Sequence, residues 1–363
     1  MNLRRIIAFA SVGLAWSAGA QGSNLSPVVI WEAEGSVSAA VGHRDNVLRS
    51  SIATESSAFF QSSVDASLIR YSDSGSLFMF YIFGEDTRYV DAPSVDYEQF
   101  ISATVQLIEP VGDRNETGLE ANYLYQHQIL DASVTEVDVN RVLVLGHSAY
   151  LRPYWMHRMG KWEAQVEASV LRQVFEHTLD DYWEAEAEAR LTRNYGNRSE
   201  VSVGYVPMWR LYDTREQYDS GGSSVPGTEL TYLQNEVDGE WRHYWDQDRH
   251  WRTTSRVSFM ASRDNGSGYF DYDRLYFREQ VWWSKGNWEI KAAARFGWYY
   301  YREQLIDNEH RYRSYATLDY SITRWLGDHW KLFTAGEHEW NMSNDPFDEY
   351  RSWMVNCGAG YEF

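Results

Sequence analysis

The sequence predicts an all-β fold: a transmembrane antiparallel β-barrel of about 16 strands, with any count between about 14 and 18 compatible with the pattern. Three observations lead to this prediction. The chain is 44% hydrophobic, yet its mean hydropathy is −0.55, so it lacks the runs of about 20 apolar residues that membrane helices need. Its aromatic content is 16%, with 17 Trp and 26 Tyr, which is typical of barrels that place these rings at both lipid–water interfaces. Finally, segments of alternating apolar and polar residues recur along the chain, separated by turn residues.

The N-terminal residues 1–20 are expected to be a secretory signal peptide. Arg4 and Arg5 supply the positive charge, residues 6–16 the apolar stretch, and residues 18–20 a cleavage site of small residues. The alternative is a buried N-terminal helix. If the segment is a signal, residues 21–30 form a short periplasmic lead-in and residues 31–363 a single barrel domain.

Period-2 alternation defines the expected strands. In residues 183–192, Trp183, alanines and Leu191 occupy one face, whereas three glutamates, Arg190 and Thr192 occupy the other. The expected strands begin near Trp31, Ala58, Leu77, Glu98, Thr117, Asp138, Lys161, Tyr182, Glu200, Glu229, His250, Tyr272, Asn287, Arg311, His329 and Tyr350. Pro207 opposes this pattern, because it removes a hydrogen-bond donor from the inside of an expected strand.

The connections alternate between short and long. Short turns are expected at 72–75, 110–113, 159–160, 194–197, 246–249, 284–287 and 327–328, most of them with Gly, Asn or Pro. The longest connection is 213–228. If the last strand runs toward the periplasm, the short turns are periplasmic and the longer loops extracellular.

The C-terminal strand carries a recognisable pattern. Asn356, Gly358, Tyr361 and Phe363 have the spacing polar–x–Gly–x–x–aromatic–x–Phe, on a strand with one apolar and one polar face. This resembles the C-terminal targeting strand of Gram-negative outer-membrane β-barrels, and the chain as a whole looks porin-like. The resemblance implies location in the outer membrane of a Gram-negative bacterium, and recognition of these four residues by the barrel-assembly machinery.

Composition restricts the partners. The formal charge of −19 disfavours nucleic acid, and a single cysteine, Cys357, excludes an intramolecular disulfide. The expected partners are outer-membrane lipid and lipopolysaccharide, with divalent cations as a further partner of acidic loops; the alternative is a merely solvated acidic rim. The carboxylates expected in those loops are Glu85, Asp86, Asp91, Asp96, Asp180, Asp181, Asp213, Glu216, Asp219, Asp307, Glu309, Asp345, Asp348 and Glu349. None has the spacing of a calcium loop, so no metal site and no cofactor are expected.

Charges on the polar strand faces separate along the chain. Acidic residues are expected to line the lumen at Glu163, Glu167, Glu184, Glu186, Glu188, Glu236, Asp238 and Glu240. Basic residues are expected to line it at Arg252, Arg256, Arg274, Arg278, Lys291, Arg295, Arg311 and Arg313, together with aromatic residues such as Tyr299 and Tyr301. General porins are similar in having opposed acidic and basic clusters. The alternative is that these residues pair with one another and simply line the wall.

These patterns favour a channel for small hydrophilic solutes or saccharides. A polysaccharide-export barrel is one alternative, and a closed structural or adhesive barrel or an outer-membrane enzyme is another. The sequence predicts no enzyme: His338-Glu339 lacks a second zinc-ligand histidine because residue 342 is Met, and no Gly-x-Ser-x-Gly motif occurs. The connections near 128–137 and 176–181 are too short for an inward-folded third loop, so side chains must narrow the pore or it is unusually open.

Overall fold

The computed structural model describes residues 30–131, 141–176 and 179–363. The expected signal peptide and all of the expected lead-in except Ile30 therefore lie outside the described residues. No helix in the described ranges is long and apolar enough to cross a membrane.

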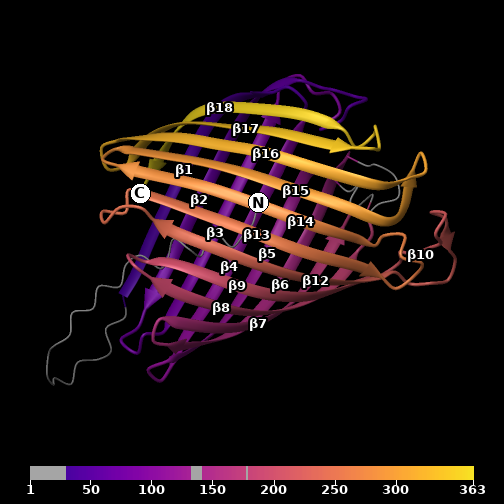
Figure 1. Cartoon of the computed structure of the whole chain (residues 1–363). Coiled ribbons are helices and arrows are strands. Elements are labelled where there is room, and N and C mark those ends of the chain that lie inside the picture. The colour runs from indigo at the N-terminus through magenta and orange to yellow at the C-terminus, as the bar shows by residue number, and fades with distance from the viewer. Residues whose placement is uncertain (1–29, 132–140, 177–178) are drawn as a thin grey trace, which may run out of the picture.

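Sixteen antiparallel strands form one closed barrel, as the sequence predicts (Figure 1). They are β1 (Ile30–Arg44), β2 (Ser57–Tyr71), β3 (Leu77–Tyr89), β4 (Tyr97–Val111), β5 (Asn115–Asp131), β6 (Arg141–Met159), β7 (Trp162–Phe175), β8 (Tyr182–Tyr195), β9 (Ser199–Tyr212), β12 (Thr231–Tyr244), β13 (Trp251–Asp264), β14 (Tyr272–Lys285), β15 (Trp288–Ile306), β16 (Glu309–Leu326), β17 (Trp330–Ser343) and β18 (Tyr350–Glu362). Each begins within a few residues of its expected start. The start expected at Asp138 lies outside the described residues, and that strand is described from Arg141.

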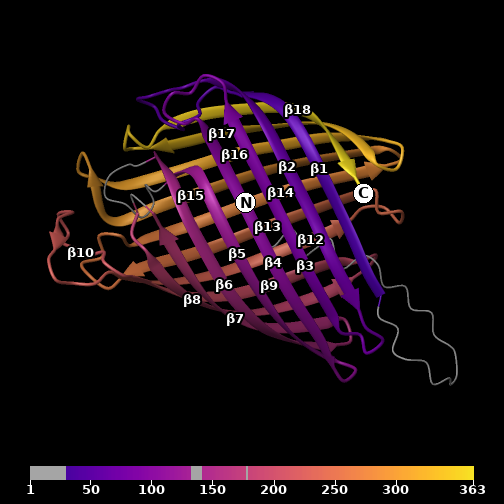
Figure 2. The ribbon, with the colours of Figure 1, turned by 180° about the vertical axis from the view of Figure 1, so that it is seen from behind.

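Each strand pairs with its neighbours in the sequence, and β1 pairs with β18 to close the ring. The long connection after β9 contains a separate hairpin, β10 (Gln217–Tyr218) and β11 (Ser224–Val225). This hairpin lies at the opposite end of the barrel from the C-terminus (Figure 1). Seen from behind, β1 to β6 run steeply across β13 to β18, so the strands are strongly tilted (Figure 2).

All seven expected short turns join their strands at one end, hereafter the short-turn end. The opposite long-loop end carries loops 45–56, 90–96, 213–230, 265–271 and 344–349. One connection there is also tight: Asp307 and Asn308, both with positive φ, join β15 directly to β16. The sequence was misleading at three acidic positions, because Glu85 and Asp86 lie within β3 and Glu309 within β16.

The burial pattern separates an apolar outside from a polar inside. On β13, Val257 and Phe259 are about half exposed, whereas Ser258 and Ser262 are buried. Large apolar side chains are exposed on the same outward face of the neighbouring strands, where lipid would cover them. A barrel in water would have the reverse arrangement.

Two prolines in strand interiors, Pro153 and Pro207, each interrupt one ladder. β8 and β9 pair on both sides of Pro207, but the pairing skips from Glu186 with Met208 to Ala189 with Tyr205. β6 and β7 show a similar gap beside Pro153. Each strand nevertheless continues, because its other neighbour remains paired through the proline.

Candidate functional site: a charged cavity in the barrel

A cavity of about 530 Å³ lies inside the barrel, nearer to the short-turn end. It is bordered by side chains from β4 to β9 and β12 to β15, all from the inward faces of these strands. Its charged lining consists of seven acidic and seven basic residues: Glu116, Glu120, Glu163, Glu167, Glu188, Glu200, Glu240, Arg152, Arg190, Arg242, Arg252, Arg256, Arg278 and Lys291. The formal charge of this lining is therefore balanced.

The charges are arranged by side. We call Glu116, Glu120, Glu163, Glu167 and Glu188 on β5, β7 and β8 the acidic wall. We call Arg252, Arg256, Arg278 and Lys291 on β13 to β15 the basic wall.

The acidic wall is bound by arginines and tyrosines from neighbouring strands. Arg158 contacts both Glu116, at 2.9 Å, and Glu163, at 3.7 Å. Glu116 also accepts a hydrogen bond from the Tyr154 hydroxyl, 3.0 Å away. Arg152 lies 3.6 Å from Glu120 and 3.7 Å from Glu167. Each of these four carboxylates therefore has an arginine beside it.

Three carboxylates on this side lie unusually close together. Glu167 is directly opposite Glu188 in the β7–β8 register, and oxygen atoms of Glu167, Glu186 and Glu188 lie within 4.8 Å of one another. Arg190 donates to Glu188 at 2.6 Å and thereby reduces the repulsion. A similar group at a short turn, Asp246 with Asp248 and His250, is an ordinary turn, because Asp246 accepts the backbone N–H groups of His250 and Trp251.

Four of the expected lumen acids are engaged in specific pairs. Glu184 accepts from Arg210 at 2.8 Å, and Glu236 binds both Arg256 and Arg274. Asp238, only 2% exposed, accepts from Arg190 and lies 3.5 Å from Arg256. Glu240 lies 3.4 Å from Arg242 and lines the cavity.

Four expected pore residues point inward but are covered. Tyr299 and Tyr301 pack with Met260 and Tyr272 in a buried cluster, in which Tyr301 is fully buried. Arg311 is paired with Asp348 of loop 344–349, and Arg313 donates to Asn341 at 2.9 Å. Asp348 was expected on a solvent-exposed outer rim, but within this loop its side chain is fully buried.

Residue-by-residue reasoning missed part of the lining. Glu116, Glu120, Arg152, Glu200 and Arg242 all border the cavity and were not among the expected lumen residues. The alternation pattern did indicate them, since Glu116 and Glu120 lie on the inward-facing side of β5. It was hidden because the early strands alternate less regularly than the later ones.

Two loops form a cap over one side of the long-loop end. Val47 of loop 45–56 and Ala92 and Val95 of loop 90–96 pack with Ile129 of β5 in a buried apolar cluster. Glu55 joins the loops by accepting from the backbone N–H of Ser94, 3.2 Å away. We call these two loops the outer cap.

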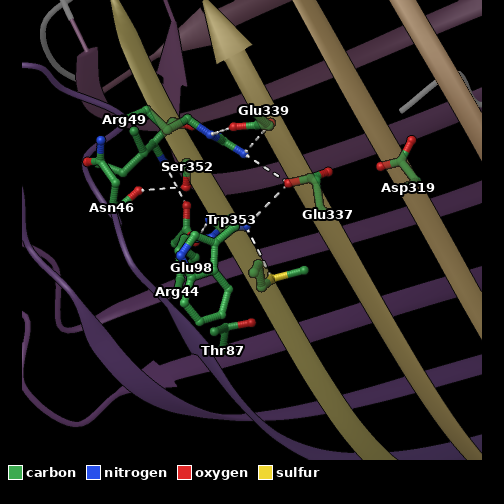
Figure 3. Close-up of polar contacts among 12 residues, drawn as sticks. Arg44, Asn46, Arg49, Thr87, Glu98, Asp319, Glu337, Glu339, Ser352 and Trp353 are labelled. Atoms are coloured by element: carbon green, nitrogen blue, oxygen red, sulfur yellow. Dashed lines mark hydrogen bonds and ion pairs between the residues drawn. The ribbon is translucent and has the colours of Figure 1, made fainter.

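Arg49 of the outer cap and Arg44 at the end of β1 contact carboxylates on separate strands of the wall (Figure 3). Arg49 donates to Glu339 of β17 at 2.8 Å and to the carbonyl oxygen of Ile129 at 3.1 Å. Arg44 lies 3.6 Å from Glu98 of β4 and 3.7 Å from Glu337 of β17. Burial opposes the charge on Arg49, but Glu339 and its neighbours prevail and raise the pKa of the guanidinium. The Arg49 guanidinium that holds the cap thus stays charged.

A second group of side chains covers the other side of the same end. Phe270 of loop 265–271 and Leu230 are fully buried against Tyr212 and Tyr232. Arg215 stacks over Phe270, with its guanidinium carbon 4.8 Å from the ring centre. Loops and aromatic side chains therefore narrow the long-loop end, while the cavity lies beneath them.

The expected assembly residues lie at the barrel seam. Phe363 and Gly35 exchange backbone hydrogen bonds of 2.9 and 3.1 Å. Tyr361 packs against Trp330, whereas Asn356 faces inward and donates to Gln61 at 3.1 Å. Gly358 is needed for close approach, because a Cβ there would collide with the backbone oxygen of Ala39 and the Phe333 ring. Their recognition by assembly machinery stays a prediction.

Comparison with known proteins agrees with the barrel architecture. No protein-family model matches the chain, and none of the curated proteins matches it. Among solved structures, OccAB3 of Acinetobacter baumannii has a TM-score of 0.52 at 8% identity, over 92% of this chain and 99% of that chain. The likeness shows the fold.

Other structures match less closely. OccAB1 of Acinetobacter baumannii has a TM-score of 0.49 at 10% identity, covering 91% of this chain and 97% of that chain. An anion-selective porin from Comamonas acidovorans has a TM-score of 0.48 at 10% identity, covering 93% of this chain and 100% of that chain.

Proposed function

We propose that the chain is an outer-membrane channel through which small hydrophilic solutes diffuse. The observation that carries the proposal is the combination of an apolar outer surface with a polar, charged cavity inside a closed ring of strands. A barrel of sixteen strands is wide enough for an aqueous path unless side chains or loops fill it. Transport of this kind requires neither a cofactor nor a chemical step.

Orientation follows from the connections. With short turns in the periplasm and long loops outside, the cavity faces the periplasmic half and the outer cap faces the exterior. The solute path would narrow at the cap and widen below it. Loops 45–56 and 90–96, rather than the third external connection, would then form the constriction.

The contents of the lumen favour small charged solutes over long saccharides. A saccharide path needs exposed aromatic rings on which sugar faces can stack. Tyr299 and Tyr301, expected to serve this purpose, are instead buried among other side chains. Small solutes therefore suit the described lumen better than a polymer does.

Lipid, lipopolysaccharide, the assembly machinery and divalent cations stay as predicted partners. The apolar exterior supports contact with lipid. A direct check is extraction of the membrane fraction, in which the protein should stay with outer-membrane markers after washing with high salt and a chelator.

Single-channel recording tests the proposed function. The purified mature chain is refolded and added to a planar bilayer at two salt concentrations. Discrete current steps whose size rises with salt are expected. A correctly folded, heat-modifiable barrel that gives no steps would contradict the channel and favour a closed structural role.

A further inference from the structure

Three arginines lie side by side on the inner wall. Arg256 of β13 is directly opposite Arg278 of β14, and Arg278 is directly opposite Arg295 of β15. Cross-strand partners have Cβ atoms about 5 Å apart, so like charges at these positions repel one another unless something neutralises them. We call these residues the arginine row.

The two outer members of the row have carboxylate partners. Arg256 lies 3.2 Å from Glu236 and 3.5 Å from Asp238. Arg295 lies 2.7 Å from Asp319 and 3.8 Å from Glu337. Each outer guanidinium therefore has two carboxylates beside it.

The central member differs. Within residues 30–131, 141–176 and 179–363, Arg278 has no carboxylate at ion-pair distance. The buried Nε atom lacks a hydrogen-bond partner in all three arginines of the row, so the missing carboxylate is what distinguishes Arg278. Arg252, also on the basic wall, has no carboxylate at ion-pair distance in these ranges and stacks over Trp282 at 5.1 Å, but it interacts electrostatically with Glu200. Both side chains border the cavity.

The lining has equal numbers of acidic and basic residues, but its charges are not all paired with one another. Arginines contact the glutamates of the acidic wall. Carboxylates contact the two outer members of the arginine row. Among the described residues, Arg278 faces the cavity without a carboxylate at ion-pair distance, and Arg252 has only the more distant Glu200. Both side chains are partly buried, so a guanidinium in this position has lost part of its hydration and gains free energy when an anion enters.

We propose that Arg278, assisted by Arg252, forms a binding site for the carboxylate of a small solute bearing a single negative charge. A guanidinium matches the two oxygens of a carboxylate, and two parallel N–H···O bonds fix its orientation. The cavity volume of about 530 Å³ lies within the range of small-molecule sites. The proposal rests on the proposed function only in that solutes must enter the lumen.

The opposite side of the cavity selects against higher negative charge. Glu163, Glu167 and Glu188 border the same space, and their paired arginines reduce their field without removing it. A solute with two or more negative charges would be drawn to Arg278 and repelled by this wall. A solute with one carboxylate and several hydroxyl groups can place its carboxylate against the basic wall and its hydroxyl groups against the acidic wall.

Gluconate and glucose make a matched pair of probes, because they are similar in size and differ in the carboxylate. Equilibrium dialysis of the detergent-purified full barrel measures binding without requiring ion flow. Gluconate is expected to bind saturably and glucose not to bind at the same concentrations. Arg278→Gln should weaken gluconate binding by roughly tenfold or more, as expected for loss of a charge-assisted hydrogen-bond pair.

Two further variants separate a specific site from general electrostatics. Arg242→Gln removes the same charge from the same cavity, but Arg242 is already paired with Glu200 and Glu240, so gluconate binding should fall much less. Arg278→Lys keeps the charge and loses the planar fork, so it should retain ion selectivity but weaken gluconate binding. Circular dichroism and heat modifiability confirm that each variant is folded.

The outcomes are distinguishable. Equal loss in Arg278→Gln and Arg242→Gln, or equal binding of gluconate and glucose, would overturn the site while leaving a conducting channel intact. Competition by inorganic phosphate as strong as by gluconate would overturn the assignment to a monocarboxylate. Saturable, Arg278-dependent binding by a barrel that gives no current steps would support the site and refute the channel.

Discussion

At the scale of residues, the same side chain has different consequences in neighbouring positions. Arg256 and Arg278 face each other across one strand pair, yet the first is flanked by two carboxylates and the second by none in the described ranges. The alternation of side chains along β13 and β14 predicts that both arginines point inward. Only the lateral positions of Glu236 and Asp238 show which guanidinium is available to a solute.

Gly118 of β5 allows the Tyr154 ring to lie across the neighbouring strand. A Cβ at residue 118 would overlap that ring, whose hydroxyl donates to Glu116. Gly118→Ala should therefore displace Tyr154 and destabilise the barrel by about 1–3 kcal/mol. Urea unfolding of the refolded barrel measures this change. Gly239→Ala is the control: a Cβ there stays 3.8 Å from the nearest atom, so its stability should be unchanged or slightly higher.

The contact between Asp213 and Arg172 should make the stability of loop 213–230 depend on pH. Hydrogen bonds of 2.6 and 2.9 Å from Arg172 hold the pKa of this carboxyl below its usual range, and outweigh desolvation. Because the folded-state pKa is lowered, the contribution to stability is complete above the ordinary pKa of about 3.9 and is lost as the pH falls through the lowered value.

Pepsin, which is active in acid, tests this dependence. Loop 213–230 should stay protected in the wild type at pH values where Asp213→Asn already allows cleavage. Asp219→Asn serves as control, because Asp219 bonds to Gly221 and Ser223 within the same loop. If wild type and Asp213→Asn open at the same pH, the Arg172 contact does not hold the loop.

At the scale of elements, the outer cap is the feature that joins separate parts of the ring. Loop 45–56 follows β1, yet it contacts β17 on one side and β5 on the other. Arg49, at the tip, has a positive φ of 50°, a conformation that costs a non-glycine residue free energy. The ion pairs and the apolar cluster around Val47 must offset this cost.

Arg49→Gln should loosen the outer cap. Loss of the two bonds to Glu339 and of the nearby charge for Glu337 is expected to cost about 2 kcal/mol. Chymotrypsin should then cleave near loop 45–56 faster, and single-channel conductance should rise if this loop narrows the path. Arg88→Gln is the matched control: Arg88 is half exposed and pairs with Asp86, and a solvent-screened surface pair contributes little, so protection of the loop should stay close to wild type. Equal protection in both variants would show that Arg49 does not hold the cap.

At the scale of the whole molecule, the sequence was sufficient for the barrel and insufficient for its contents. Strand positions follow from local alternation, and the short turns from Gly, Asn and Pro, so both were predictable. Inward direction was predictable for the same reason. Burial was not predictable, because it depends on residues distant in the sequence: Asp348 of loop 344–349 covers Arg311, and Tyr272 of β14 packs against Tyr301. The pairing state of Arg278 depends likewise on several strands at once.

The division between outside and inside makes a global prediction. Val257 lies near the middle of β13 and is about half exposed on the outer face, whereas Thr254 of the same strand lines the cavity. Val257→Arg should destabilise the folded barrel in a bilayer by about 2–4 kcal/mol, because it places a charge against hydrocarbon. Thr254→Arg should cost much less, since the cavity is polar. Denaturant unfolding in lipid vesicles compares the two, and equal costs would refute the assigned faces.

The seam between β1 and β18 has a consequence for how the ring comes into being. Every other strand pairing joins neighbours along the chain and can arise as each hairpin emerges, whereas this one brings together segments from opposite ends of it. It is also short, extending from Ser36 with Glu362 to Arg44 with Met354, so little is gained until all its contacts form together. We therefore expect closure to be the slow, cooperative step of assembly. Substitutions at Gly42 or Gly358, where the two edges touch, would leave a curled but open sheet rather than an unfolded chain.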